Sequence, residues 1–428
     1  MAPIKKQGIQ WRFRVAARDL REGFMAIVFE AAAPRFISSR SFRRFKGQDQ
    51  VNSFLASATS VFCLLLLLTL CTATPLLAQH YQQTNLVSDV PGLARFTDPD
   101  LVNAWGLTSG PSTPWWVADN GTGLSTLYNA AGVKQGLKVT VAAPAGDPDP
   151  ATPTGVVFNG STDFQLTPGV TTSAARFIFV TEDGTISGWN PSVDPTHSVI
   201  VANNAGSAIY KGATIAQAGG ANFLYVANFF SGTVDVFDAN FAPVTLGAGA
   251  FVDPTLPAGF APFNVQAIGG NIYVGFAKQD EDKEDEVAGR KLGYVDVFDA
   301  SGTLLQRFEN GPWMNAPWGL ALAPSRTASS TGFGKSSGML LVGMFGSGQI
   351  ATFDPATGDF EGLLRDRHGK PIQIDGLWAL RFGNGATAGP TTTLFFTAGI
   401  DDEAHGLFGT ITPIPKRGNG DDDGDDEQ

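Results

Sequence analysis

Short apolar segments recur along the chain at a nearly constant interval. Six of them open a repeat: WGLTSG at Trp105, GVVFNG at Gly155, GATIAQ at Gly212, VQAIGG at Val265, GLALAP at Gly319 and LWALRF at Leu377. Their starts lie 50, 57, 53, 54 and 58 residues apart. A fixed period of this length is typical of repeat architectures, so the pattern predicts six copies of one structural unit.

Each repeat continues with further strand-like segments. A second apolar segment occupies 115–120, 177–183, 223–229, 271–277, 340–346 and 394–400. A third segment, in which apolar and polar residues alternate in the first five repeats, occupies 124–129, 185–190, 233–238, 294–299, 349–354 and, less regularly, 407–412. Asn or Asp ends most of the third segments, and these residues favour turns. We therefore predict three strands per repeat, followed by a turn and a variable fourth strand.

This pattern predicts an all-β chain that folds as a six-bladed β-propeller over residues 79–415. Blades packed face to face around an axis cover one another and leave only short, protected edges. The last repeat has no fourth segment of its own, so we expect 81–90 to pair beside 406–412 and close the ring. A β-helix and a pair of sandwiches are the competing folds; the period is long for the first, and six like repeats do not divide naturally into the second.

Residues 1–78 differ from the repeats and predict export. They carry eleven Lys and Arg against four acids, then an apolar run from Val61 to Leu70 and small residues before a predicted cleavage after Ala78. This order is typical of a secretory signal and predicts a periplasmic or extracellular protein. Membrane anchoring by 61–78 is the alternative. Because the basic region is long, Met25 is a candidate for the true start.

Charge and cysteine content limit the partners and the crosslinks that the chain can have. The whole chain has 29 basic and 40 acidic side chains, so residues 79–428 carry 18 and 36, a formal net charge of −18. Such a chain is not expected to bind nucleic acid. Both cysteines, Cys63 and Cys71, lie in the leader, so a cleaved chain would form no disulfide. The acidic end, 416–428, is expected to be a disordered tail, and we expect a monomer.

Several motifs resemble an uncharacterised family of exported bacterial β-propellers, many of which end in a PEP-CTERM sorting tail. The motifs are at 85–107, 210–216, 294–308, 315–324, 374–385 and 394–409. No PEP motif follows Pro415 here, which argues against sorting by that route. The repeats are more distantly similar to NHL-type and calcium-dependent lactonase propellers. The lactonase resemblance implies metal ligands where each innermost strand begins.

Residues that enter the innermost strands should face one mouth of the axial channel. This rule, with the ends of the second strands, predicts a ligand site formed by Trp105, Thr154, Lys211, Asn228, Asn264, Trp318 and Asp375. Three interpretations of the site stay open. Asn264 and Asp375 could hold calcium, although the Lys211 ammonium would oppose it. Asp375 could instead pair with Lys211 or cap backbone amides. Finally, Lys211 with the Asn and Trp side chains could form a cup for an anionic or sugar-like ligand. The two tryptophans could instead plug the gap between blades.

The chain lacks the motifs of nucleophilic catalysis. No Gly-x-Ser-x-Gly elbow occurs, and the four histidines show no metal-ligand spacing. His405 alone lies among acids, as a general base, a metal ligand or a loop residue bonded to nearby carboxylates. The acidic segment 279–286 is expected to be a solvated loop over one face. We therefore expect a binding or scaffold module for a small molecule, a glycan or a protein, with a metal-assisted hydrolase or lactonase centred on Asp375, Asn264 and Asn228 as the alternative.

Overall fold

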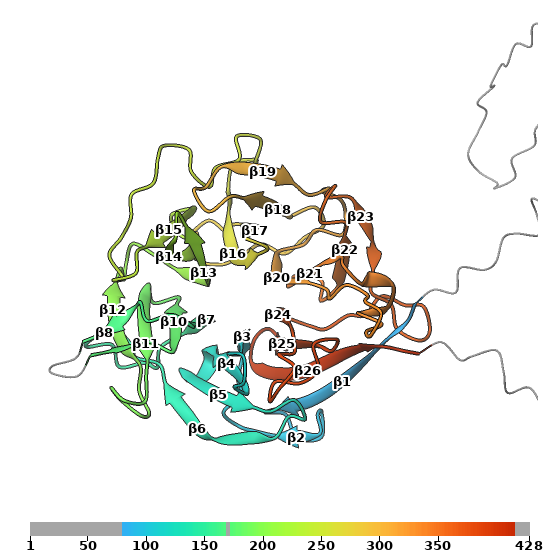
Figure 1. The fold of residues 1–428 in the computed structure, drawn as a ribbon, viewed down its shortest axis with the longest axis horizontal. Coiled ribbons are helices and arrows are strands. Elements are labelled where there is room, and N and C mark those ends of the chain that lie inside the picture. Colours follow the sequence, from blue (N-terminus) through green and yellow to red (C-terminus); the bar gives the residue numbers. More distant parts are fainter. Residues whose placement is uncertain (1–78, 168–171, 416–428) are drawn as a thin grey trace, which may run out of the picture. The chain divides into compact units, whose positions relative to one another are not determined.

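A computed structural model describes residues 79–167 and 172–415. In this part of the chain six antiparallel sheets follow one another around a common axis, which confirms the six-bladed β-propeller (Figure 1). The innermost strand of each blade contacts the innermost strands of its two neighbours. The leader 1–78 and the tail 416–428 lie outside the described residues. Within the described residues no helix is long and apolar enough to span a membrane.

The strands of the blades match the predicted segments closely. Blades 1 and 2 consist of β3 (Ala104–Thr108), β4 (Trp115–Asp119), β5 (Leu124–Tyr128) and β6 (Lys134–Thr140), then β7 (Pro153–Phe158), β10 (Phe177–Thr181), β11 (Thr185–Trp189) and β12 (Val199–Asn203). Blades 3 and 4 consist of β13 (Tyr210–Ala218), β14 (Ala221–Asn228) and β15 (Thr233–Phe237), then β16 (Phe260–Ile268), β17 (Asn271–Lys278), β18 (Gly293–Phe298) and β19 (Leu304–Arg307).

The last two blades complete the ring. Blade 5 consists of β20 (Pro317–Leu322), β21 (Leu340–Met344), β22 (Ile350–Phe353) and β23 (Phe360–Leu363); blade 6 of β24 (Leu377–Phe382), β25 (Leu394–Ile400), β26 (His405–Pro413), β1 (Tyr81–Ser88) and β2 (Phe96–Thr97). A small hairpin, β8 (Gln165–Leu166) and β9 (Ser173–Ala174), is inserted in blade 2, and two 3₁₀ turns lie at Asn120–Thr122 and Gly334–Ser336.

The predicted closure of the ring is confirmed. β1 runs antiparallel to β26, from the pair Tyr81–Pro413 to the pair Ser88–Leu407, with one irregularity between Asn85 and Val87. In Figure 1 the blue first strand lies against the red last strand. The N-terminal strand thus supplies the outer strand that the last repeat lacks, so both ends of the domain are held in one sheet.

Glycines at the start of the repeats let the innermost strands approach one another. A Cβ on Gly106 would lie 2.6 Å from the carbonyl oxygen of Thr154, and one on Gly155 would lie 3.0 Å from the backbone nitrogen of Ala213. No side chain fits at these distances, which explains why four repeats carry glycine at or next to this point. Farther out, apolar side chains fill the space between blades; Trp116 of blade 1, for example, stacks on Phe177 of blade 2 at 3.9 Å.

Blade 3 departs from the prediction because it has three strands only. The chain begins a fourth strand, since Val244 N–H donates to Val236 O, but it then turns at 247–250. Phe251 N–H donates instead to Gly302 O of blade 4, and the buried Phe251 ring packs on Tyr225 and Phe298. Burial of this ring between two blades diverts the segment that would otherwise have completed the sheet.

Candidate ligand-binding site

The structure places the starts of the innermost strands and the ends of the second strands at one mouth of the channel. Polar side chains from three blades are hydrogen-bonded together there. Asn103 Nδ2 donates to Asn120 Oδ1 at 3.2 Å, and Asn120 Nδ2 donates to Glu182 Oε2 at 2.8 Å. Lys211 Nζ donates to Glu182 Oε1 at 2.5 Å. Residues more than one hundred positions apart thus form one polar network, which we call the mouth network.

An aromatic cluster lies beneath the mouth network. Trp378 stacks on Trp105 with ring centroids 3.7 Å apart and on Phe345 at 4.0 Å, while Trp318 meets both Trp105 and Trp378 edge to face. Two of these indoles are bonded: Trp318 Nε1 donates to Lys211 O and Trp378 Nε1 to Asn103 Oδ1. Trp105 and Trp318 are therefore parts of a buried plug and offer no free face for a sugar.

The channel below this cluster is narrow. The cavity between the innermost strands has a volume of only about 10 Å³, roughly the room of one water molecule. A ligand larger than water therefore has no room between the innermost strands at this point.

Lys211 is buried, but its charge is already neutralised. Its side chain is 1% exposed, and Nζ lies 2.5 Å from Glu182 Oε1 and 3.0 Å from Asp285 Oδ1. Burial alone would lower the pKa of Lys211, but these carboxylates outweigh it and hold the pKa above its usual value. The ammonium also lies over the rings of Trp105 and Phe229, at 5.2 and 5.8 Å from their centroids. Lys211 is therefore not the free positive charge that the sequence suggested.

Carboxylates dominate the rim of the mouth. Four of them surround the single ammonium of Lys211: Glu182, Asp285, Glu286 and Glu403. Burial, aided by the charges of Glu403 and Asp285 and opposed by Lys211, raises the pKa of Glu286 to about 8. Burial also raises the pKa of Glu403, whose Oε2 accepts a bond of 2.6 Å from Asn103. At neutral pH Glu286 thus holds a proton, and the rim as a whole keeps a negative charge.

Two loops deliver Asp285, Glu286 and Glu403, whereas Glu182 directly follows β10. The predicted acidic loop 279–286 does cover part of the mouth: Asp280 N–H bonds Asp285 O, and Asp285 reaches Lys211. The other loop is a turn in which Asp401, Asp402 and Glu403 all have positive φ, between 50° and 64°. Three successive residues other than glycine in this region store strain, which the hydrogen bonds of the turn must offset.

The remaining predicted residues lie elsewhere or serve the backbone. Buried Thr154 donates to the carbonyl of Tyr210 at 2.6 Å. Asn264 donates to Trp318 O and accepts from Val265 N–H, so both of its polar atoms are used. Asn228 bonds Asp235 at a groove of blade 3. Exposed Asp375 accepts from Asp401 N–H and so holds the strained turn, as a cap on a backbone amide rather than a partner of Lys211.

Asn264 and Asp375, the two residues of the calcium interpretation, each bond backbone groups in the structure. No three His, Cys, Asp or Glu residues in 79–167 and 172–415 are placed to hold a metal ion. His405 bonds Asp89 at 2.6 Å and not the acids next to it in sequence. His405, the first residue of β26, therefore ties that strand to the end of β1 within the last blade.

Sequence reasoning missed Asp285, Glu286 and Glu403. Both acidic runs are visible in the sequence, but 279–286 was predicted to be a solvated loop and 401–403 was considered only as the surroundings of His405. The missing information was which loops rise on the same side of the ring as Lys211.

Comparison with known proteins places the chain among viral relatives. It is 32% identical over 338 residues to "Uncharacterized protein R648" of Acanthamoeba polyphaga mimivirus, which covers 76% of this chain and 78% of that protein. It is 33% identical over 341 residues to "Uncharacterized protein L690" of the same virus, covering 76% and 84%. The chain belongs to the family of these proteins. No family model matches it.

Solved structures give only distant matches. One is described as "Streptogramin B lyase structure", with a TM-score of 0.44 and 10% identity over 78% of this chain and 98% of that one. Another is a structural genomics protein of unknown function from Bacteroides thetaiotaomicron, with a TM-score of 0.48 and 10% identity over 79% and 76%. Neither bears on the chemistry of this chain. The relatives found do not support the narrower bacterial PEP-CTERM family.

Proposed function

We propose that this protein is a binding module whose channel mouth receives a positively charged group, an amine or a guanidinium, of a small molecule or a partner protein. The excess of carboxylates over lysines at the channel mouth carries the proposal. Four acids face one ammonium there. An added cation would replace the proton of Glu286 and relieve repulsion among the carboxylates.

Electrostatics disfavours an anionic ligand at the same place. Lys211 already has two carboxylate partners, and an incoming anion would have to displace Glu182 or Asp285, whose negative charges would then oppose it. Like charges this close in a partly buried site repel strongly. This argument counts against the anionic-ligand interpretation, one of the three that the sequence left open.

A hydrolase centred on Asp375, Asn264 and Asn228 has no comparable support. Each of these side chains bonds a backbone group or a neighbour in its own region. No cleft gathers them around a position that a substrate could take. Fold likeness alone does not supply an activity, because propellers carry many.

We also propose that the protein acts outside the cytoplasm. This rests on the order of basic, apolar and small residues in 1–78. The acidic surface of residues 79–428 would attract cationic ligands over a distance of about one Debye length. Anchoring through 61–78 would keep the domain at the membrane without changing the site.

Titration of tryptophan fluorescence tests the proposal, because Trp105 lies next to Lys211. Agmatine and spermidine are expected to bind residues 79–428 and to lose affinity as salt rises, whereas citrate and glucose are expected to have no effect. Glu286→Gln and Glu403→Gln should each weaken agmatine about tenfold, and Glu361→Gln, an exposed acid of the outer strand β23, should not. Binding of citrate in place of agmatine, or equal binding by all three variants, would overturn the proposal; saturable binding of calcium ions would favour the metal alternative.

A further inference from the structure

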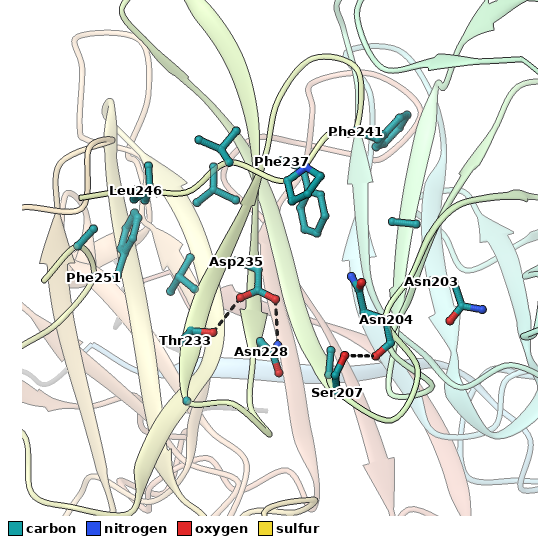
Figure 2. Close-up of a pocket in the computed structure, with 18 of the residues that line it drawn as sticks. Asn203, Asn204, Ser207, Asn228, Thr233, Asp235, Phe237, Phe241, Leu246 and Phe251 are labelled. Atoms are coloured by element: carbon teal, nitrogen blue, oxygen red, sulfur yellow. Dashed lines mark hydrogen bonds between the residues drawn. The ribbon is translucent and has the colours of Figure 1, made fainter. Parts of the chain in front are cut away.

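Blade 3 carries a groove along the outer edge of its third strand. The groove has a volume of about 710 Å³ and lies between the segment 201–208 that includes the end of β12 and the diverted segment 241–252 (Figure 2). Apolar side chains line much of it, among them Val201, Phe241, Leu246 and Phe251. Val252, at its rim, is 54% exposed.

The floor of the groove is an open strand edge. Alternate residues of a strand direct their backbone groups to the same side. Val236 O accepts from Val244 N–H on the outer side, so the backbone groups of Val234 point outward as well. Within the described residues, the N–H and C=O of Val234 and the N–H of Val236 have no backbone partner on that side. An unpaired edge of this kind is a template for a further strand.

Blade 4 shows what the same sequence does when its fourth strand is present. Residues 233–238 (TVDVFD) match residues 294–299 (YVDVFD) in blade 4. In blade 4 the fourth strand β19 places Arg307 directly opposite Asp296. The Arg307 guanidinium bonds both carboxylate oxygens of Asp296, at 2.9 and 3.1 Å. A strand completed in this way pairs the buried carboxylate with a guanidinium.

Asp235 is the counterpart of Asp296, but it has no cationic partner in the part of the chain that the structure describes. Its carboxylate accepts bonds from Asn228 Nδ2 at 2.9 Å and Thr233 Oγ1 at 2.8 Å, both drawn in Figure 2, and from Tyr210 OH at 3.3 Å. It is the only charged side chain among the residues that line the groove. The position taken by Arg307 in blade 4 corresponds to Leu246 here, which has left the edge of the sheet.

We propose that this groove binds an extended peptide of a partner protein as the missing fourth strand of blade 3, with an arginine or lysine of the peptide on Asp235. One face of the added strand carries the basic residue toward Asp235. The other face carries apolar residues toward Val234, Val236 and Leu246, which already pack together on the side of blade 4. Main-chain hydrogen bonds to Val234 would supply affinity, and the Asp235 pair would supply selectivity, as in other peptides that extend a sheet.

The peptide GTLLQRFE, which copies residues 302–309 around β19, is a suitable probe. We expect the labelled peptide to bind residues 79–428, measured by fluorescence anisotropy, and the same peptide with glutamine in place of arginine to bind about fivefold more weakly. In Asp235→Asn the amide oxygen can still accept from Asn228 and Tyr210, while the amide nitrogen can donate to Thr233 Oγ1. This variant should abolish the difference, whereas Glu361→Gln should leave it unchanged. Hydrogen exchange of the Val234 and Val236 amides should slow when the peptide binds.

Two binding results would overturn the inference: no binding up to millimolar peptide, or equal binding of the two peptides to the unmodified chain. It would also be overturned if the Val234 amide exchanged slowly in the absence of peptide and light scattering showed the chain to be a dimer. None of these bears on the channel mouth, because Asp235 lies outside the mouth network and agmatine binding is measured separately.

Discussion

Asn103 and Glu403 lie 300 positions apart in sequence and share a hydrogen bond of 2.6 Å from Nδ2 to Oε2. Asn103 precedes the first inner strand, and Glu403 belongs to the strained turn of the last blade. Closure of the ring by β1 and β26 brings them together. Closure of the ring therefore positions one of the carboxylates of the channel mouth.

Glu403→Gln should lower the pKa of Glu286. Glutamine can still accept the bond from Asn103, so the turn should be kept while one negative neighbour of Glu286 is lost. Without that repulsion Glu286 ionises more readily, and its pKa should fall below the present value of about 8. Carbon-detected NMR titration of glutamate carboxyls measures this directly. An unchanged Glu286 titration would show that the two acids are not neighbours.

Lys211→Met should destabilise the domain, because it leaves Glu182 and Asp285 without their cation. We expect a loss of about 1–3 kcal/mol in urea unfolding, less than for a fully buried pair, since Asp285 can turn into solvent. Lys138→Met, at a surface ion pair with Asp100, should cost under about 1 kcal/mol. Similar losses in the two variants would contradict a buried role for Lys211.

The contact between His405 and Asp89 should make ring closure dependent on pH. Its hydrogen bond to Asp89 raises the pKa of His405. The contact therefore stabilises the fold fully below the unfolded pKa of about 6.5, and this contribution is lost as pH rises through the folded pKa. Asp89→Asn should lower the melting temperature more in mild acid than in mild alkali. An equal decrease at both would indicate that the proton on His405 is irrelevant.

The buried carboxyl of Asp119 should make the folded domain less stable as pH rises. It is fully buried at the end of β4, where Oδ2 accepts from Thr126 N–H while Oδ1 has no partner among the described residues. Burial raises its pKa well above the usual value, so the domain should lose stability as pH rises from about 4, the unfolded pKa. Asp119→Asn should flatten this slope and stabilise the domain by about 1 kcal/mol at neutral pH, whereas exposed Asp359→Asn should not. Parallel stability profiles of Asp119→Asn and the unmodified chain would refute the assignment.

The sequence predicted the ring well because the determinants of the blades are local. The apolar segments repeat six times, glycine near the start of inner strands and Asn or Asp at turns recur in most repeats, and each acts on neighbouring residues. Blade 3 escaped prediction because a single ring, Phe251, is buried against the next blade and diverts the chain. That is a tertiary contact, and the local pattern of 238–246 carries no sign of it.

The mouth was predicted in position but not in chemistry. Lys211 was expected to define its charge, yet the acids that surround it come from loops whose direction the repeat does not encode. Because Asp375 precedes the sixth inner strand, it was expected at the mouth, but its carboxylate accepts a hydrogen bond from a backbone amide. Strand periodicity locates the starts of strands, whereas the path of a loop decides which side chains meet there.

Proton release on cation binding tests the central claim most directly. At neutral pH Glu286, with a pKa of about 8, holds most of a proton, and a cation at the mouth should expel it. Calorimetric titration with agmatine in buffers of different ionisation enthalpy should show release of close to one proton per molecule bound at about pH 7, and almost none in Glu286→Gln. Binding without proton release, or the same release in Glu286→Gln, would contradict a cation site at the channel mouth.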